Sequence, residues 1–253
     1  MVTQVITAAT SSGNVFQRLL DAAIPFGKYQ LHWLELIGVL IGVVSAWYGM
    51  KRRVWAWPIG MVANVMLFFV YIGAAFGADS RIPLFGQSGR QVFLFLTSVY
   101  GWWAWLQFRR ANGAGAATPA VNPRWATTRE RLALAATWLV LTVVAHQVFV
   151  YLTNLAPNPY WTPQWWYFWC DAWVFVGSMM ATYAMARGWN EFWLCWIVVD
   201  LVGVPMGFAT GYVPTAVMYI FYGAFVLYGF SQWVKVTREA KAAPHRDTVQ
   251  ANV

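Results

Sequence analysis

Seven long apolar runs set the strongest limit on what this chain can fold into. Each run holds about 20 residues, the length that an α-helix needs to cross the hydrocarbon core of a bilayer. A transmembrane β-barrel would instead show segments of about ten residues with alternating polarity. The sequence therefore predicts an all-α polytopic membrane protein with seven transmembrane helices, at residues 33–50, 54–75, 88–108, 132–152, 166–186, 191–210 and 213–234.

The composition and the placement of charge agree with a membrane location. Charged residues make up 10% of the 253 positions, whereas a soluble domain carries about 25%. The net charge of +8 could suit a nucleic-acid partner, but all of the 17 Lys and Arg residues except Arg18, Lys28, Arg81 and Arg90 fall on one side of the predicted topology. The positive-inside rule then places the C-terminus in the cytoplasm and the N-terminus outside, and the basic residues indicate contact with anionic lipid rather than nucleic acid.

Residues 1–31 form a leader without the basic start and apolar block of a secretory signal peptide. From residue 13 onward the leader mixes apolar side chains such as Phe16 and Ile24 with polar ones such as Arg18. This mixture predicts an amphipathic helix on the membrane surface, and a disordered leader is the alternative.

A second feature is an internal repeat. Residues 57–64 and 193–200, which are 136 positions apart, both begin with Trp and end seven residues later with a short polar side chain, Asn64 or Asp200. Positions i, i+3 or i+4, and i+7 share a face of a helix, so each copy presents one stripe of aromatic and polar groups. In the third span of each half the offset falls to 128 positions.

One unpaired span, residues 132–152, separates the two three-helix units. Three spans plus one return the chain to its starting side, so the units enter the membrane in the same orientation, as a parallel repeat about an axis along the membrane normal. The predicted organisation is a leader at 1–31, a first bundle at 32–110, a cytoplasmic loop at 111–131, the linker helix at 132–152, a second bundle at 165–235 and a cytoplasmic tail at 236–253.

The three-one-three arrangement resembles that of the SWEET sugar transporters. The paired motifs Trp-x-x-Gly-x-x-x-Asn and Trp-x-x-Trp-x-x-x-Asp, together with 18 Trp residues, resemble more closely the bacterial PnuC nicotinamide riboside transporters over residues 33–234. The resemblance implies import of nicotinamide riboside, an NAD precursor, across the bacterial inner membrane, trapping by phosphorylation after uptake, and a homotrimer. The first motif has Gly60 where the second has Trp196, so the halves cannot make identical contacts.

Asp200 lies about ten residues from either end of its span, which places it near the middle of the bilayer. A charged side chain there costs about 2.5 to 3.5 kcal/mol on insertion scales, so we expect it to face a cavity or a partner. Asn64 has the same depth in the first half, and sites at the midplane between repeats are typical of transporters. We expect the two to face each other across a substrate cavity. The alternative is that both only hold helices together.

A carboxylate beside aromatic rings favours a flat cation, because aromatic faces attract positive charge and the carboxylate neutralises it. The pyridinium ring of nicotinamide riboside is such a ligand, and thiamine is the alternative substrate. Amide and hydroxyl side chains would bind the ribose and the carboxamide, while most Trp residues are expected in the core or at the membrane interface. The predicted substrate-binding residues are Trp57, Asn64, Gln91, Trp193, Trp196, Asp200, Tyr219 and Tyr222.

Three further residues are candidates for gating. Glu35 and Asp171 match each other in the repeat, near the outer ends of the first and fifth spans. They either gate the outer mouth or bond to neighbouring groups. Pro205 frees backbone carbonyls inside its span, and it is either a hinge for alternating access or a static kink.

No catalytic, metal-binding or phosphate-binding pattern is present, which predicts a protein with neither enzymatic activity nor a cofactor. Cys170 and Cys195 are expected to be small core residues. A retinal-binding sensor is disfavoured because the last span has no Lys in its middle. Few acids lie inside the membrane to couple ions, so we expect facilitated diffusion by alternating access. A non-transporting sensor or scaffold is the alternative from a different class.

Overall fold

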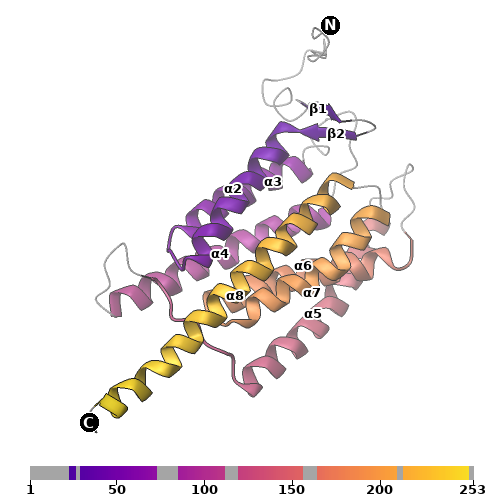
Figure 1. Ribbon diagram of the computed structural model, residues 1–253. Helices are drawn as coiled ribbons and strands as arrows, with labels where there is room; N and C mark the ends of the chain where they lie inside the picture. Colours follow the sequence, from indigo (N-terminus) through magenta and orange to yellow (C-terminus); the bar gives the residue numbers. More distant parts are fainter. Residues whose placement is uncertain are drawn as a thin grey trace, which may run out of the picture.

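The computed structural model of the chain is a bundle of helices (Figure 1). It describes residues 23–26, 29–72, 85–111, 119–155, 164–209 and 213–250. The elements are β1 Ala23–Phe26, β2 Tyr29–His32, α2 Trp33–Met50, α3 Ala56–Ile72, α4 Phe85–Ala111, α5 Thr128–Leu155, α6 Tyr167–Ala186, α7 Glu191–Ala209 and α8 Val213–Gln250. These helices confirm the predicted helical architecture.

The two strands form a short antiparallel hairpin, in which Ala23 pairs with His32 and Phe26 pairs with Tyr29. The hairpin lies where α2 begins, and the C-terminus lies at the opposite end of the bundle (Figure 1). The amphipathic helix predicted for the leader is therefore wrong for residues 23–26 and 29–31. Pro25 lacks the backbone donor that a helix interior needs, and the aromatic and β-branched residues around it favour strands. The rest of that predicted helix lies outside the described residues.

The helices form two groups of three with the same pattern of neighbours. In the first group α3 packs against both α2 and α4, and in the second group α7 packs against both α6 and α8. The main contact between the groups is α4 against α6, with a smaller one between α2 and α8. The linker helix α5 packs mainly against α6. This is the arrangement of neighbours expected for two three-helix units and a linker.

The first helix of each group ends in the same kind of turn. Arg52 after α2 and Gly188 after α6 each donate a backbone N–H to the carbonyl three residues earlier at 2.9 Å, and the following residue donates to the carbonyl five residues earlier at 2.9 Å. Both turns are Schellman caps, with φ of 55° at Arg52 and 70° at Gly188. Glycine adopts this left-handed conformation without strain, whereas an Arg side chain is strained there.

By length and composition alone, α2, α5 and α7 are the three helices in the described ranges that are long and apolar enough to cross a membrane. α3 is apolar but shorter, over Ala56–Tyr71. Buried polar residues lower the hydropathy of α4 and α6. These include Ser88, Gln91, Ser98, Asp171, Ser178 and Thr182. The predicted spans therefore include helices whose polar groups face the protein interior rather than lipid.

Several helices run beyond the predicted spans. α4 begins at Phe85 rather than 88, and α5 begins at Thr128 rather than 132. The largest difference is α8, which continues to Gln250 through the region predicted as a tail. Residues 235–243 contain neither Gly nor Pro and include several Lys, Arg, Glu and Ala residues. These residue types have high helix propensity, which explains the continuation.

Candidate functional site

A cavity of about 260 Å³ lies between the two groups of helices. Its described lining residues come from α2, α3, α4, α6, α7 and α8. The lining is mainly apolar and aromatic, with a small number of polar groups, which is the usual character of a small-molecule site. Both groups of helices must therefore be present for this cavity to exist.

The cavity collects the residues that the repeat and the midplane argument selected. All eight predicted substrate-binding residues line it, namely Trp57, Asn64, Gln91, Trp193, Trp196, Asp200, Tyr219 and Tyr222. Glu35 also lines it. The shared location agrees with one site formed by both halves, and the role of each residue in binding stays a prediction.

Trp57 and Trp193 form equivalent parts of the wall, each packed on a glycine of the third helix in its group. A Cβ atom on Gly101 would lie 2.3 Å from the Trp57 ring, and a Cβ atom on Gly229 would lie 2.2 Å from the Trp193 ring. Real Cβ contacts are never this short, so only glycine admits the indole at either position. Both Trp residues are buried.

Each indole also contacts a second tryptophan, which lies one helical turn after the glycine on the same helix. Trp57 and Trp105 meet edge to face with their ring centroids 5.2 Å apart, and Trp193 and Trp233 meet in the same way at 6.2 Å. The Trp233 indole N–H also donates to the Met50 carbonyl at 3.0 Å, which ties α8 to the end of α2. These contacts fix the positions of the two cavity-lining rings.

The asymmetry between Gly60 and Trp196 has a steric cause. A Cβ atom on Gly60 would lie 2.8 Å from the Ser45 hydroxyl oxygen, and that hydroxyl donates to the Ala56 carbonyl at 2.7 Å. An indole at position 60 would displace this hydrogen bond. Only the second half therefore places a second indole from its motif in the cavity.

Asp200 and Asn64 line the cavity from α7 and α3. The Asp200 carboxylate lies next to α8, with Oδ2 3.7 Å from the position of a Cβ atom on Gly223. The neighbouring Tyr222 hydroxyl donates to the Val39 carbonyl at 3.1 Å and so links α8 to α2. The direct opposition of Asp200 and Asn64 stays a prediction.

Arg90 is a cavity residue that the sequence argument missed. The count of basic residues on each side of the membrane assigned Arg90 to the outer side. Arg90 instead lines the cavity from α4, so it should not be counted as a loop charge in the positive-inside argument. Its Nη1 donates to the Tyr219 hydroxyl at 3.1 Å. Its Nε is buried and has no hydrogen-bond partner in the described part of the chain. The available signal was its position directly before Gln91, a predicted site residue.

Two of the gating candidates lie outside the cavity lining. Asp171 is a buried residue of α6, 6% exposed, and it interacts electrostatically with Arg90. Pro205 is exposed on α7, which continues as a helix from Glu191 to Ala209. The gating role of Glu35 and Asp171 and the hinge at Pro205 stay predictions.

Residues 119–127, here called the strap, cross one end of the bundle before α5. The Ala120 N–H donates to the Arg52 carbonyl at 2.7 Å, and the Arg124 N–H donates to the Gly188 carbonyl at 2.9 Å. The buried side chains of the strap are those of Ala120, Val121, Pro123 and Ala126. The strap therefore joins the turn after α2 to the equivalent turn after α6.

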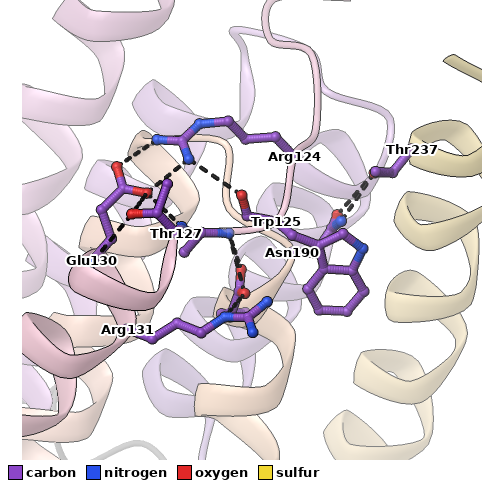
Figure 2. Close-up of polar contacts among 9 residues, drawn as sticks. Arg124, Trp125, Thr127, Glu130, Arg131, Asn190 and Thr237 are labelled. Carbon is purple, nitrogen blue, oxygen red and sulfur yellow. Dashed lines mark hydrogen bonds and ion pairs between the residues drawn. The ribbon is translucent and has the colours of Figure 1, made fainter. Parts of the chain in front are cut away.

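Side chains fix the same end of the bundle (Figure 2). The buried Glu191 carboxylate at the start of α7 accepts the Ala126 N–H at 3.0 Å and the Arg131 Nε–H at 2.7 Å. The Asn190 side-chain amide donates to the Thr237 hydroxyl at 2.9 Å. These bonds connect the strap and α5 to α7, and α7 to α8.

An exposed ion pair starts α5. Arg124 donates two hydrogen bonds to the Glu130 carboxylate, at 2.8 and 2.7 Å, and the Thr127 N–H donates to it at 2.8 Å. The Glu130 N–H donates to the Thr127 hydroxyl at 3.3 Å, which completes a capping box. The hydrogen bonds from Arg124 lower the pKa of Glu130 to about 2.

Comparison with known proteins gives consistent relatives. Residues 32–235 match the model of the family described as nicotinamide mononucleotide transporter. The riboflavin/roseoflavin transporter RibM of Streptomyces davaonensis is 36% identical over 213 residues, covering 84% of this chain and 89% of the relative. The nicotinamide riboside transporter PnuC of Escherichia coli is 27% identical over 236 residues, covering 87% of this chain and 93% of the relative.

A solved structure supports the fold. The crystal structure of the vitamin B3 transporter PnuC superposes with a TM-score of 0.58 at 20% identity, covering 82% of this chain and 83% of that one. These relatives are transporters, which confirms the prediction that the chain is not an enzyme. The chain therefore belongs to the nicotinamide mononucleotide transporter family and is a membrane transporter of the PnuC type.

Proposed function

We propose that the protein imports a heteroaromatic vitamin that carries a ribose or ribityl chain. The cavity carries this proposal, because both groups of helices build it and it combines buried indoles with amide, hydroxyl and charged groups. A flat ring can stack on the indoles of Trp193 and Trp196, while sugar hydroxyls can bond to Asn64 and Gln91. The Gln91 amide nitrogen is buried and has no partner among the described residues, so it is available to a ligand.

Two substrates of this class have support. Nicotinamide riboside is the substrate predicted from the sequence, and it is also the substrate in the name of the Escherichia coli relative PnuC. Riboflavin is the substrate in the name of a relative with 36% identity. Arg90 favours riboflavin as the first candidate, because a guanidinium in the wall offsets the Asp200 charge and removes the need for a cationic ring. The same argument disfavours thiamine.

The transport mode is proposed to be facilitated diffusion with alternating access. Glu35 and Asp200 are the acids among the described lining residues, and the cation Arg90 lines the same cavity. This leaves few groups to couple proton or sodium movement. A homotrimer in the bacterial inner membrane, with the N-terminus outside and the C-terminus in the cytoplasm, completes the proposal.

Uptake into liposomes tests the proposal. Purified protein is reconstituted, and the uptake of labelled riboflavin, nicotinamide riboside and thiamine is measured with and without proton and sodium ionophores. We expect saturable uptake of riboflavin, weaker uptake of nicotinamide riboside and no effect of ionophores. Inhibition by ionophores would contradict facilitated diffusion. Binding without uptake of any of the three would support the sensor or scaffold instead.

A further inference from the structure

We propose that Arg90 and Asp200 together recognise the amide or imide edge of the substrate ring. In this arrangement Arg90 donates to a carbonyl oxygen of the substrate and Asp200 accepts the neighbouring N–H. The inference rests on the proposed function and deepens it, because it identifies the hydrogen-bonding edge of the ring, rather than its charge, as the feature that the two residues recognise.

Tyr219 places the two charged residues along one stretch of wall. Its hydroxyl accepts the hydrogen bond from Arg90 at 3.1 Å. Its ring lies against α7, where a Cβ atom on Gly203 would be 3.3 Å away. Gly203 is one helical turn from Asp200, and all three polar residues line the same cavity. The structure thus brings a cation from α4 into contact with Tyr219, and the Tyr219 ring lies one helical turn from an anion of α7.

Arg90 keeps hydrogen-bonding capacity after its bond to Tyr219. A guanidinium has five N–H donors. The described residues provide one hydrogen-bond acceptor for it, the Tyr219 hydroxyl, and its Nε–H is buried without a partner. A buried donor on a charged group is unfavourable unless something bonds to it. A carbonyl oxygen of a ligand is a suitable partner.

Asp200 has the complementary capacity. Within the described ranges no hydrogen bond reaches its carboxylate, whose Oδ2 lies 3.7 Å from the position of a Cβ atom on Gly223. An ionised carboxylate only accepts hydrogen bonds. It therefore suits an N–H donor on the ligand, and it disfavours a second negative group.

The two candidate substrates share the required edge. Nicotinamide riboside carries a carboxamide, and the ring of riboflavin carries an imide in which an N–H lies between two carbonyls. Both present an acceptor next to a donor, which matches a donor, Arg90, and an acceptor, Asp200, in the lining of one cavity. Sites built to bond a polar group reject analogues that lack it far more strongly than apolar pockets reject a size difference. The pair would thus exclude ring acids of the same shape.

Binding of matched analogues to purified protein tests this assignment. Calorimetry compares nicotinamide riboside with nicotinic acid riboside, whose carboxylate has no N–H, and riboflavin with 3-methylriboflavin, whose imide N–H is blocked. We expect the wild type to bind each parent at least about tenfold more tightly than its analogue. Asp200→Asn should reduce the ratio of the affinities for nicotinamide riboside and nicotinic acid riboside at least tenfold, because it removes the repulsion between Asp200 and the carboxylate of nicotinic acid riboside. Asp200→Ala should likewise reduce the ratio of the affinities for riboflavin and 3-methylriboflavin.

Variants of Arg90 test the other half of the pair. Arg90→Gln should weaken the binding of both nicotinamide riboside and riboflavin at least about tenfold. Arg90→Lys keeps the charge but loses the planar guanidinium with its several N–H donors, so its affinities should lie between those of wild type and Arg90→Gln. Arg110→Gln, an exposed residue of the same helix, is the control and should bind as wild type. Thermal unfolding and size-exclusion profiles check that each variant folds. If Arg90→Gln does not fold, the inference is tested by the affinities of Arg90→Lys and by the affinity ratios of the Asp200 variants.

Two outcomes would count against the idea in different ways. If Asp200→Asn and Asp200→Ala fold and keep the wild-type affinity ratios for both ligand pairs, Asp200 does not recognise the edge of the substrate ring and the inference is wrong. If wild type binds neither parent ligand, the proposed function itself is wrong, and the inference falls with it.

Discussion

The Arg90 guanidinium donates to the Tyr219 hydroxyl at 3.1 Å, although 129 positions separate the two residues in the chain. The bond joins α4 of the first group of helices to α8 of the second along the wall of the cavity. A movement of one group relative to the other has to stretch or break it. A ligand beside Arg90 is therefore well placed to favour one arrangement of the two groups over another.

Tyr219→Phe removes the acceptor and keeps the ring. We expect the affinity for riboflavin to fall by about 1.5 to 3 kcal/mol, the usual loss for a hydrogen bond to a charged group. Isothermal titration calorimetry measures it. Tyr228→Phe, on the exposed side of the same helix, is the control. Equal affinities of Tyr219→Phe and wild type would mean that this bond does not organise the binding site.

Trp193→Ala should weaken ligand binding more than Trp193→Phe, because Phe keeps an aromatic face for the ligand ring and Ala does not. Trp193 is 2% exposed, so Trp193→Ala should also lower the free energy of unfolding by about 3 to 5 kcal/mol. Binding is measured below the unfolding temperature of each variant. Unchanged affinity of a folded Trp193→Ala protein would remove this indole from the binding site.

The two equivalent turns predict stability changes of opposite sign. Arg52→Gly should raise the free energy of unfolding by about 1 kcal/mol, because it relieves a left-handed Arg while the backbone bond from Ala120 is kept. Gly188→Ala should lower it, because φ is 70° and a Cβ atom would lie 2.5 Å from Val121 Cγ2. Thermal unfolding in detergent compares both with wild type. A lower thermal midpoint for Arg52→Gly would show that the Arg52 side chain stabilises the fold by more than its left-handed backbone destabilises it.

Gly101→Ala and Gly229→Ala should each destabilise the protein by about 1 to 3 kcal/mol, because the added methyl group overlaps an indole. Each should also weaken transport, since Trp57 or Trp193 has to shift within the cavity wall. Gly89→Ala, whose Cβ atom would have an ordinary contact of 3.9 Å, is the control in α4. Retention of full uptake by both variants would indicate that the exact position of the indoles is unimportant for transport.

Glu191→Gln should lower the free energy of unfolding by about 1 to 3 kcal/mol, because a buried carboxylate with three hydrogen bonds loses its charge. Glu130→Gln at the exposed ion pair is the matched change and should have a much smaller effect at neutral pH. Since the hydrogen bonds from Arg124 lower the pKa of Glu130 from its ordinary 4.5 to about 2, the stability that Glu130 contributes is present above pH 4.5 and is lost as the pH falls towards 2. Thermal midpoints measured from neutral pH to pH 3 test both statements.

The sequence was sufficient for the helical spans and for the polar and aromatic residues that the repeat selects in the cavity lining. Apolar runs located the spans, and the repeated motif selected Trp57, Asn64, Trp193 and Asp200, because residues seven positions apart share a helix face. The equivalent packing of the two indoles agrees with the repeat. Superposition of α2–α4 on α6–α8 by a rotation about the membrane normal stays a prediction.

The errors have physical causes. Arg90 was counted with the outer side of the membrane, although it falls inside the predicted span 88–108, because a charged residue near the start of a span is usually at the membrane surface. Its bond to Tyr219 depends on packing between helices of different groups. The strap has no periodic pattern, and its bonds are mostly backbone groups that any residue supplies. The paired strands at residues 23–26 and 29–32 are too short for an alternating pattern to be distinguished from an amphipathic helix.

The strap also bears on how the chain could be divided. It continues directly into α5 and is bonded to α7 through Glu191, so a break in the backbone between residues 111 and 119 would leave it on the C-terminal fragment. That fragment would still present the Ala120 N–H to the Arg52 carbonyl of the N-terminal one. Co-expression of residues 1–111 and 119–253 as separate polypeptides should therefore reconstitute a complete transporter, with the strap serving as the docking element between the two fragments.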